Sequence, residues 1–129
     1  MSIFASKRFE PVQGRQVFEK LFVNDVCLID EFEQEIVSNQ QHISELKTIY
    51  AYMNFLASGR ILPEKKFKKI KTGKNSQNLY EFKSKHLRVY VFGIPRGKMV
   101  VLGGYKKNQK ADIKIFKSIV KEYFEQIDN

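Results

Sequence analysis

The basic side chains of this chain are concentrated in its central segment, and they define the chemistry that the chain can do. The 129 residues carry a formal net charge of +9. Residues 60–110 contain 15 Lys and Arg but only 2 Asp and Glu, whereas residues 1–59 and 111–129 have net charges of −3 and −1. A surface that only maintained solubility would mix both signs. The segregated charge favours nucleic acid or an acidic protein as the partner.

Arginine and lysine in this segment suit the transition state of phosphoryl transfer. Alternation along residues 87–92 places Arg88 on one face of a predicted strand, together with Tyr90 and Phe92. The planar guanidinium can bind two phosphate oxygens, so we expect Arg88 to clamp that transition state. Lysines of neighbouring segments can line the same concave basic surface, namely Lys68, Lys69, Lys71, Lys83, Lys85, Lys106 and Lys107.

Cleavage of RNA without a metal also needs a base for the 2′-hydroxyl proton and an acid for the leaving 5′-oxygen. Lysines crowded by like charges have a lowered pKa, which makes Lys83, Lys85, Lys106 and Lys107 candidates. His86 titrates in the useful range, or is an ordinary surface residue of a turn. Glu81 is either a base or an ion-pair partner of Arg88. Tyr90 can stack an RNA base or belong to the core.

The sequence lacks the residues that other types of reaction require. Cys27 is the only cysteine and lies in an apolar run, as a buried structural thiol does. The two histidines, His42 and His86, have no zinc-site spacing, and the glycine-rich nucleotide-binding motifs are missing. Glu64 and Glu81 are the only carboxylates of the basic segment, which disfavours a two-metal mechanism. We therefore expect neither a metal nor a cofactor.

The elements that must position these residues follow from hydrophobic spacing. Residues 18–23 are predicted to form a first strand. A helix capped by Asn24 or Asp25 should end near residues 38–39, and a second helix should end before Gly59, giving a helical hairpin. From residue 63 the period changes to two, which predicts strands at 67–71, 79–83, 87–92 and 98–102, and a loop at 71–76. A closing helix should follow Asp112 as its cap.

This order predicts an α+β domain in which helices pack against a mostly antiparallel sheet. We interpret residues 1–16 as an N-terminal extension and residues 17–129 as a single domain. The chain has no apolar run long enough for a membrane span, and its N-terminus is too charged for a signal peptide. We expect a soluble, cytoplasmic protein that does not bind membranes.

Two segments of the basic region resemble the RelE/HigB toxin superfamily, in particular its phage-derived Gp49-like branch. These are residues 79–92, LYEFKSKHLRVYVF, and residues 98–110, KMVVLGGYKKNQK. The resemblance implies a RelE-like fold and a type II toxin that cleaves messenger RNA on the translating ribosome. It also implies a cognate antitoxin, usually a helix-turn-helix protein encoded nearby. Arg88 matches the family's arginine at the scissile phosphate, and Lys106, Lys107 and Lys110 match its basic motif.

Three functional classes are compatible with the sequence. A ribosome-dependent endoribonuclease toxin is favoured, because the resemblance and the carboxylate-poor basic surface agree. A non-catalytic nucleic-acid-binding module would use the same surface without cleavage. A phage-derived protein that binds an acidic partner would be indifferent to RNA.

Overall fold

The computed structural model describes residues 1–71 and 78–127, so residues 72–76 of the predicted loop lie outside the described residues. The elements are β1 (Phe4–Arg8), β2 (Val17–Val23), α1 (Leu28–Glu35), α2 (Gln40–Ala57), β3 (Phe67–Lys69), β4 (Leu79–Lys83), β5 (Leu87–Ile94), β6 (Gly97–Tyr105) and α3 (Gln109–Ile127). A single 3₁₀ turn, Lys106–Asn108, joins β6 to α3. This order confirms the predicted α+β class.

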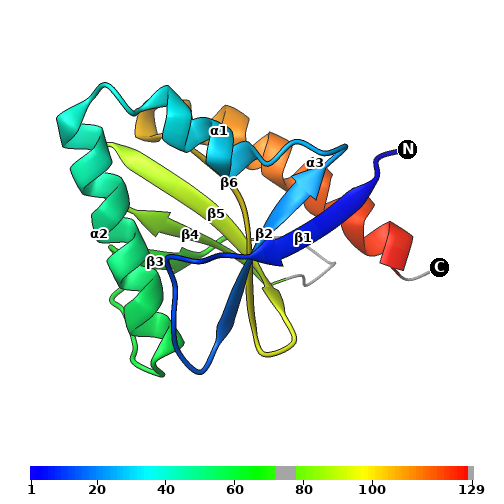
Figure 1. Cartoon of the computed structure of the whole chain (residues 1–129), viewed down its shortest axis with the longest axis horizontal. Coiled ribbons are helices and arrows are strands. Elements are labelled where there is room, and N and C mark those ends of the chain that lie inside the picture. The colour runs from blue at the N-terminus through cyan, green and yellow to red at the C-terminus, as the bar shows by residue number, and fades with distance from the viewer. Residues whose placement is uncertain (72–77, 128–129) are drawn as a thin grey trace.

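The strands form one six-stranded sheet in the described part of the chain, in the order β1-β2-β6-β5-β4-β3 (Figure 1). All neighbouring pairs are antiparallel except β2 and β6, which run parallel and are separated in sequence by α1, α2 and the strands β3–β5. The basic strand β3 is at one edge, as predicted. The longest strands, β5 and β6, lie near the centre and carry the lysine-rich segments at their ends.

Two apolar layers hold the helices on opposite faces of this sheet. On one face α1 packs against β2 and β6, and α2 packs against β4 and β5, burying Ile29, Phe32, Ile49 and Met53. On the other face α3 packs against β5 and β6 through Phe116 and Val120. The predicted alternation along β5 is confirmed, because Val89 lies in the first layer and Tyr90 in the second. In Figure 1 the helices accordingly flank the sheet.

The helix starts differ from those predicted. Asn24 and Asp25 adopt left-handed backbone conformations (φ 51° and 67°) in a turn after β2, so neither caps α1, which begins at Leu28. The helix α3 begins at Gln109, and Asp112 lies within its first turn rather than at its cap. The end of α2 is as predicted, since Gly59 follows it with a φ of 93°.

The N-terminal segment belongs to the fold, in contrast to the extension expected for residues 1–16. Residues 4–8 form β1, which pairs antiparallel with β2 along its whole length. The side chains of Phe9 and Val12 are buried in the same layer as α1 and α2. Short segments rich in charge give a weak strand signal, because only one of their faces contacts apolar neighbours.

Gly97 is the position where a side chain would disturb the sheet most directly. A Cβ atom there would lie 1.7 Å from the carbonyl oxygen of Val17, the residue paired with it on β2. We expect Gly97→Ala to lower the free energy of unfolding by about 1–3 kcal/mol, as overpacking does. Urea denaturation measures this. Gly93→Ala is the control, because its Cβ would come no closer than 3.2 Å to a side-chain atom of Asn78. Equal stability of both variants would contradict the pairing.

Among the residues described, no helix combines the length and the apolar character needed to cross a membrane.

Candidate active site

Arg88, the expected phosphate clamp, is buried in the structure. It is only 7 % exposed, and its Nη1 donates hydrogen bonds to the carbonyl oxygens of Ser84 (2.7 Å) and Leu87 (2.8 Å). A guanidinium bound to backbone carbonyls supports the turn between β4 and β5. The strand pattern predicted the face on which Arg88 lies, but not that α3 covers this face.

Glu81 and Tyr90 are buried on the same face as Arg88. Both carboxylate oxygens of Glu81 accept from Nε2 of Gln109 at 2.9 Å, at the start of α3. Tyr90 is fully buried and its ring centroid lies 5.5 Å from that of Phe116. The expectation that Tyr90 stacks an RNA base is therefore corrected: its ring belongs to the core beneath α3. Burial also raises the pKa of its phenol.

Several predicted lysines lie on other parts of the surface. Lys68 and Lys69 are exposed on β3. The Nζ atom of Lys68 lies 3.9 Å from Oε1 of Glu64, four residues earlier in the chain. Lys71 is exposed after β3, Lys83 is half-buried at the end of β4, and Lys110 is exposed in the first turn of α3. Of the predicted lysines, Lys85, Lys106 and Lys107 line one cavity, and these five lysines are not part of its lining.

That cavity has a volume of about 820 Å³. It lies where the end of α1 and the start of α2 meet the turn before β5 and the segment after β6. Four predicted residues line it: Lys85, His86, Lys106 and Lys107. The other lining residues are Glu35, Ile36, Ser38, Asn39, His42 and Tyr105. We call this the histidine–lysine cavity.

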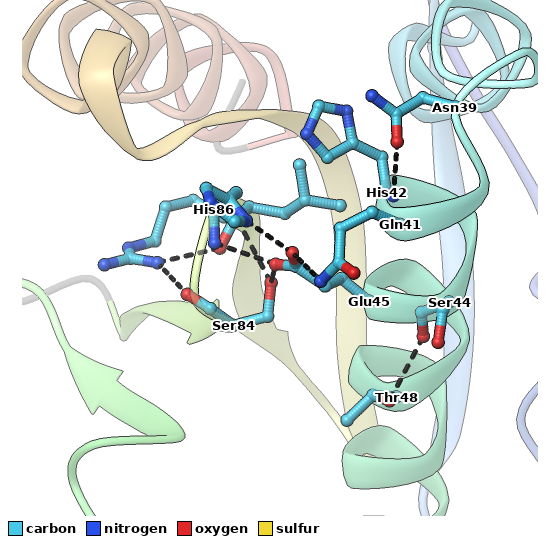
Figure 2. A network of polar contacts seen from close by, with 10 residues as sticks. Asn39, Gln41, His42, Ser44, Glu45, Thr48, Ser84 and His86 are labelled. Carbon is cyan, nitrogen blue, oxygen red and sulfur yellow. Dashed lines mark hydrogen bonds and ion pairs between the residues drawn. The ribbon is translucent and has the colours of Figure 1, made fainter.

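His86 is held in this cavity by a buried carboxylate. Its Nδ1 lies 2.6 Å from Oε2 of Glu45, a residue of α2 that is only 7 % exposed. Figure 2 shows the side chains of Ser84 and His86 meeting Glu45, with Gln41 on the other side. The backbone N–H of His86 (2.7 Å) and the Ser84 hydroxyl (2.5 Å) both donate to Oε1 of Glu45. Gln41 Nε2 donates to Oε2 at 2.9 Å.

These hydrogen bonds keep Glu45 ionised. Burial alone would raise the pKa of its carboxyl group, but the hydrogen bonds from Ser84, Gln41 and His86 outweigh burial and lower the pKa to about 2. An ionised carboxylate at Nδ1 fixes the orientation of the imidazole ring and places the Nδ1 proton toward Glu45. The other ring nitrogen, Nε2, is then available to exchange a proton with a substrate.

A second histidine lies beside the first. His42 is in the first turn of α2, where its backbone N–H donates to Oδ1 of the capping residue Asn39 at 3.0 Å. The centroid of its ring is 5.8 Å from that of His86 and 5.5 Å from that of Tyr105. A hydrogen bond with Glu35, aided by burial, raises the pKa of Tyr105 to about 12, so this phenol stays neutral. The cavity thus holds two imidazoles and three lysines.

His42, Glu45 and Tyr105 are the site residues that the sequence pattern did not identify. His42 and Glu45 are three residues apart, so they share one face of α2, and that spacing is the signal available in the sequence. Their proximity to His86 depends on how α2 packs against β4 and β5. Within residues 1–71 and 78–127, no three His, Cys, Asp or Glu side chains gather in a way that would hold a metal ion.

Comparison with known proteins adds no relative: no family model, no curated protein and no solved structure matches this chain.

Proposed function

We propose that this chain is a metal-free endoribonuclease and that RNA is cleaved in the histidine–lysine cavity. The observation that carries the proposal is His86, held at Nδ1 by the buried, ionised Glu45 in a cavity that three lysines line. An oriented imidazole is the group that most often transfers protons in catalysis at neutral pH. Lysines nearby supply the positive charge that a phosphoryl transition state requires.

The proposed reaction is an internal transfer at phosphorus. Nε2 of His86 removes the proton from a ribose 2′-hydroxyl, and the 2′-oxygen forms a bond to the adjacent phosphorus while the bond to the 5′-oxygen breaks. His42, close enough to reach a second oxygen of the same phosphate, donates a proton to the leaving 5′-oxygen. The products are a 2′,3′-cyclic phosphate and a 5′-hydroxyl, and Lys85, Lys106 and Lys107 stabilise the charge on the non-bridging oxygens.

The resemblance to RelE/HigB toxins supports a more specific form of this proposal. In that form the substrate is messenger RNA in the A site of the translating ribosome, in the cytoplasm, and a cognate antitoxin restrains the enzyme. In this form the groups that bind the scissile phosphate differ from those that the resemblance implies. Arg88, which matches the family's arginine at that phosphate, is buried and bound to backbone carbonyls.

The test is to incubate the purified protein with messenger RNA, free in EDTA and on programmed ribosomes in a magnesium-containing buffer, and to map new 5′ ends at single-nucleotide resolution. Cuts within the A-site codon that occur only on ribosomes support the toxin. Cuts in free RNA as well support a general endoribonuclease. Absence of cuts in both samples contradicts the proposed function.

A non-catalytic RNA-binding module is the second candidate, and the burial of Arg88 favours it. Because Arg88 is buried, phosphates at this cavity would be bound by the exposed lysines, Lys85, Lys106 and Lys107. Such a module would bind single-stranded RNA with strong salt dependence and would leave it intact.

Both candidates require the cavity lysines to bind the RNA backbone. We expect the triple variant Lys85→Ala/Lys106→Ala/Lys107→Ala to bind single-stranded RNA more weakly. The plot of the logarithm of the association constant against the logarithm of the salt concentration has a negative slope, and its magnitude should fall by about 2. This follows because about 0.7 counterions are released for each phosphate contact and three contacts are removed. Fluorescence anisotropy across a salt series measures both quantities.

A matched control removes the same charge elsewhere. Lys114, Lys117 and Lys121 are exposed on α3, outside the cavity lining. Their triple alanine variant should retain most of the salt dependence of RNA binding. Equal losses of affinity in both triple variants would show that RNA binding depends on the net charge of the protein and not on the cavity lysines.

A further inference from the structure

A second basic cavity lies at the opposite end of the β5–β6 hairpin. It has a volume of about 690 Å³, and its lining residues are Arg15, Gln16, Asn78, Tyr80, Gly93, Ile94, Pro95, Arg96, Gly97 and Lys98. Three of these residues are cationic and none is acidic. The eight residues of β5 separate it from the histidine–lysine cavity by roughly 25 Å at about 3.3 Å per residue. We call it the hairpin cavity.

Arg15 is anchored in this cavity by the end of α2. The backbone N–H groups of Arg15 and Gln16 both donate to the carbonyl oxygen of Ala57, at 2.8 and 3.1 Å. Gly14 packs so closely on Ala57 that a Cβ atom there would lie 2.8 Å from the Ala57 backbone. Arg15 therefore extends from a fixed main chain, so binding a ligand has to order only its side chain.

Arg96 occupies a conformation that disfavours side chains. It lies in the turn between β5 and β6 with a φ of 71°, the left-handed region that glycine adopts without strain. Its carbonyl oxygen accepts from the backbone N–H of Val17 at 2.9 Å, which fixes the turn against β2. A tight turn can require a positive φ at its third residue, where an arginine carries backbone strain that glycine avoids.

Lys98 is the partly buried member of the cationic group. Its Nζ donates to Oε1 of Gln16 at 3.1 Å and lies 5.5 Å from the centroid of the Tyr80 ring. No ion pair among the described residues includes Lys98, Arg15 or Arg96. Burial lowers the pKa of this ammonium group, as expected where no anion offsets the lost hydration. A bound anion would supply that missing partner.

We propose that the hairpin cavity binds the phosphate group of a nucleotide, either free or at the end of an RNA strand. The fork of an arginine matches phosphate oxygens, and two arginines with one lysine offer three positive charges to a phosphate dianion. Tyr80 and Pro95 contribute apolar atoms to the wall, and the volume is in the range of small-molecule sites. This site is independent of the reaction proposed for the histidine–lysine cavity.

The test is calorimetric titration of the full chain with inorganic phosphate, the four nucleoside 5′-monophosphates, and a short RNA with or without a 5′-phosphate. The titrations use the Lys85→Ala/Lys106→Ala/Lys107→Ala background, so that the other cavity does not contribute. We expect the monophosphates to bind at least tenfold more tightly than inorganic phosphate. Tighter binding of the 5′-phosphorylated RNA than of free nucleotides identifies an RNA end as the ligand, and the reverse identifies a free nucleotide.

Two variants assign the binding to this cavity. Arg96→Gly removes the guanidinium and relieves the backbone strain, so the variant should be at least as stable as its parent and yet bind nucleotide at least tenfold more weakly. Lys98→Met preserves the apolar stem and should weaken binding similarly. Amide resonances of Gln16 and Gly97 should shift on titration. Unchanged affinity in both variants, or inorganic phosphate binding as tightly as nucleotides, would overturn the proposal.

Discussion

Replacement of His86 by alanine is expected to lower the rate constant for RNA cleavage by about 10²–10⁴-fold, the usual contribution of a positioned acid or base. The imidazole is the group that Glu45 orients within the histidine–lysine cavity. The backbone N–H of His86 also donates to Glu45, and alanine retains that bond. The variant should therefore remain folded, and single-turnover kinetics with a labelled RNA measure the loss.

Three comparisons make this result specific. His42→Ala should also lower the cleavage rate, because the second imidazole is the proposed acid. Lys47→Ala, an exposed position on α2 outside the cavity lining, should leave the rate unchanged. Added imidazole should restore part of the activity of His86→Ala. Full activity of His86→Ala would remove the histidine from the reaction.

Replacement of Glu45 by glutamine is expected to destabilise the fold and to slow cleavage together. Four donors converge on the two carboxylate oxygens, and the amide nitrogen of glutamine would face at least one of them. The lowering of the pKa of Glu45 from 4.5 to about 2 corresponds to roughly 3 kcal/mol of unfolding free energy at neutral pH. We expect a loss of about 2–3 kcal/mol in urea denaturation at pH 7. Cleavage should fall at least tenfold, since His86 loses its orienting partner.

The pH dependence of this loss has a defined sign. Because the pKa of Glu45 is lower in the folded than in the unfolded chain, its stabilising contribution is complete above about pH 4.5 and disappears as the pH falls toward 2. The stability difference between wild type and Glu45→Gln should therefore narrow between pH 5 and pH 2.5. Glu10→Gln, at an exposed loop position, is the control and should show no such difference. A pH-independent difference would mean that Glu45 is not the ionised centre of the network.

The sequence pattern predicted the fold class because the spacing of apolar residues is strong in α2, β5 and β6. Val89 and Tyr90 lie on opposite faces of β5, as alternation requires. The pattern did not predict β1, where a charged edge segment pairs with β2 through backbone hydrogen bonds that any side chain permits. Nor did it predict the turn at Asn24 and Asp25, since both residue types also cap helices.

Prediction of the candidate site was limited by tertiary packing. Parity placed Arg88 on a face with Tyr90 and Phe92, but whether that face contacts solvent depends on where α3 lies. Conversely, His86 gained importance only because α2 brings Glu45 and His42 to it from more than 40 residues away. Contacts of this kind depend on the packing angle of a helix, which hydrophobic periodicity does not specify.

The most direct measurement of the central claim uses two RNA oligonucleotides of the same sequence, one with a 2′-deoxy substitution at the mapped cleavage site. Both are incubated with the protein in EDTA, or in a magnesium-containing buffer on programmed ribosomes if cleavage requires them, and the product ends are identified by mass spectrometry. The proposed reaction predicts cleavage of the unmodified RNA alone, with a 2′,3′-cyclic phosphate and a 5′-hydroxyl as products. Cleavage of the deoxy-substituted oligonucleotide at that site, or products ending in a 5′-phosphate, would contradict it.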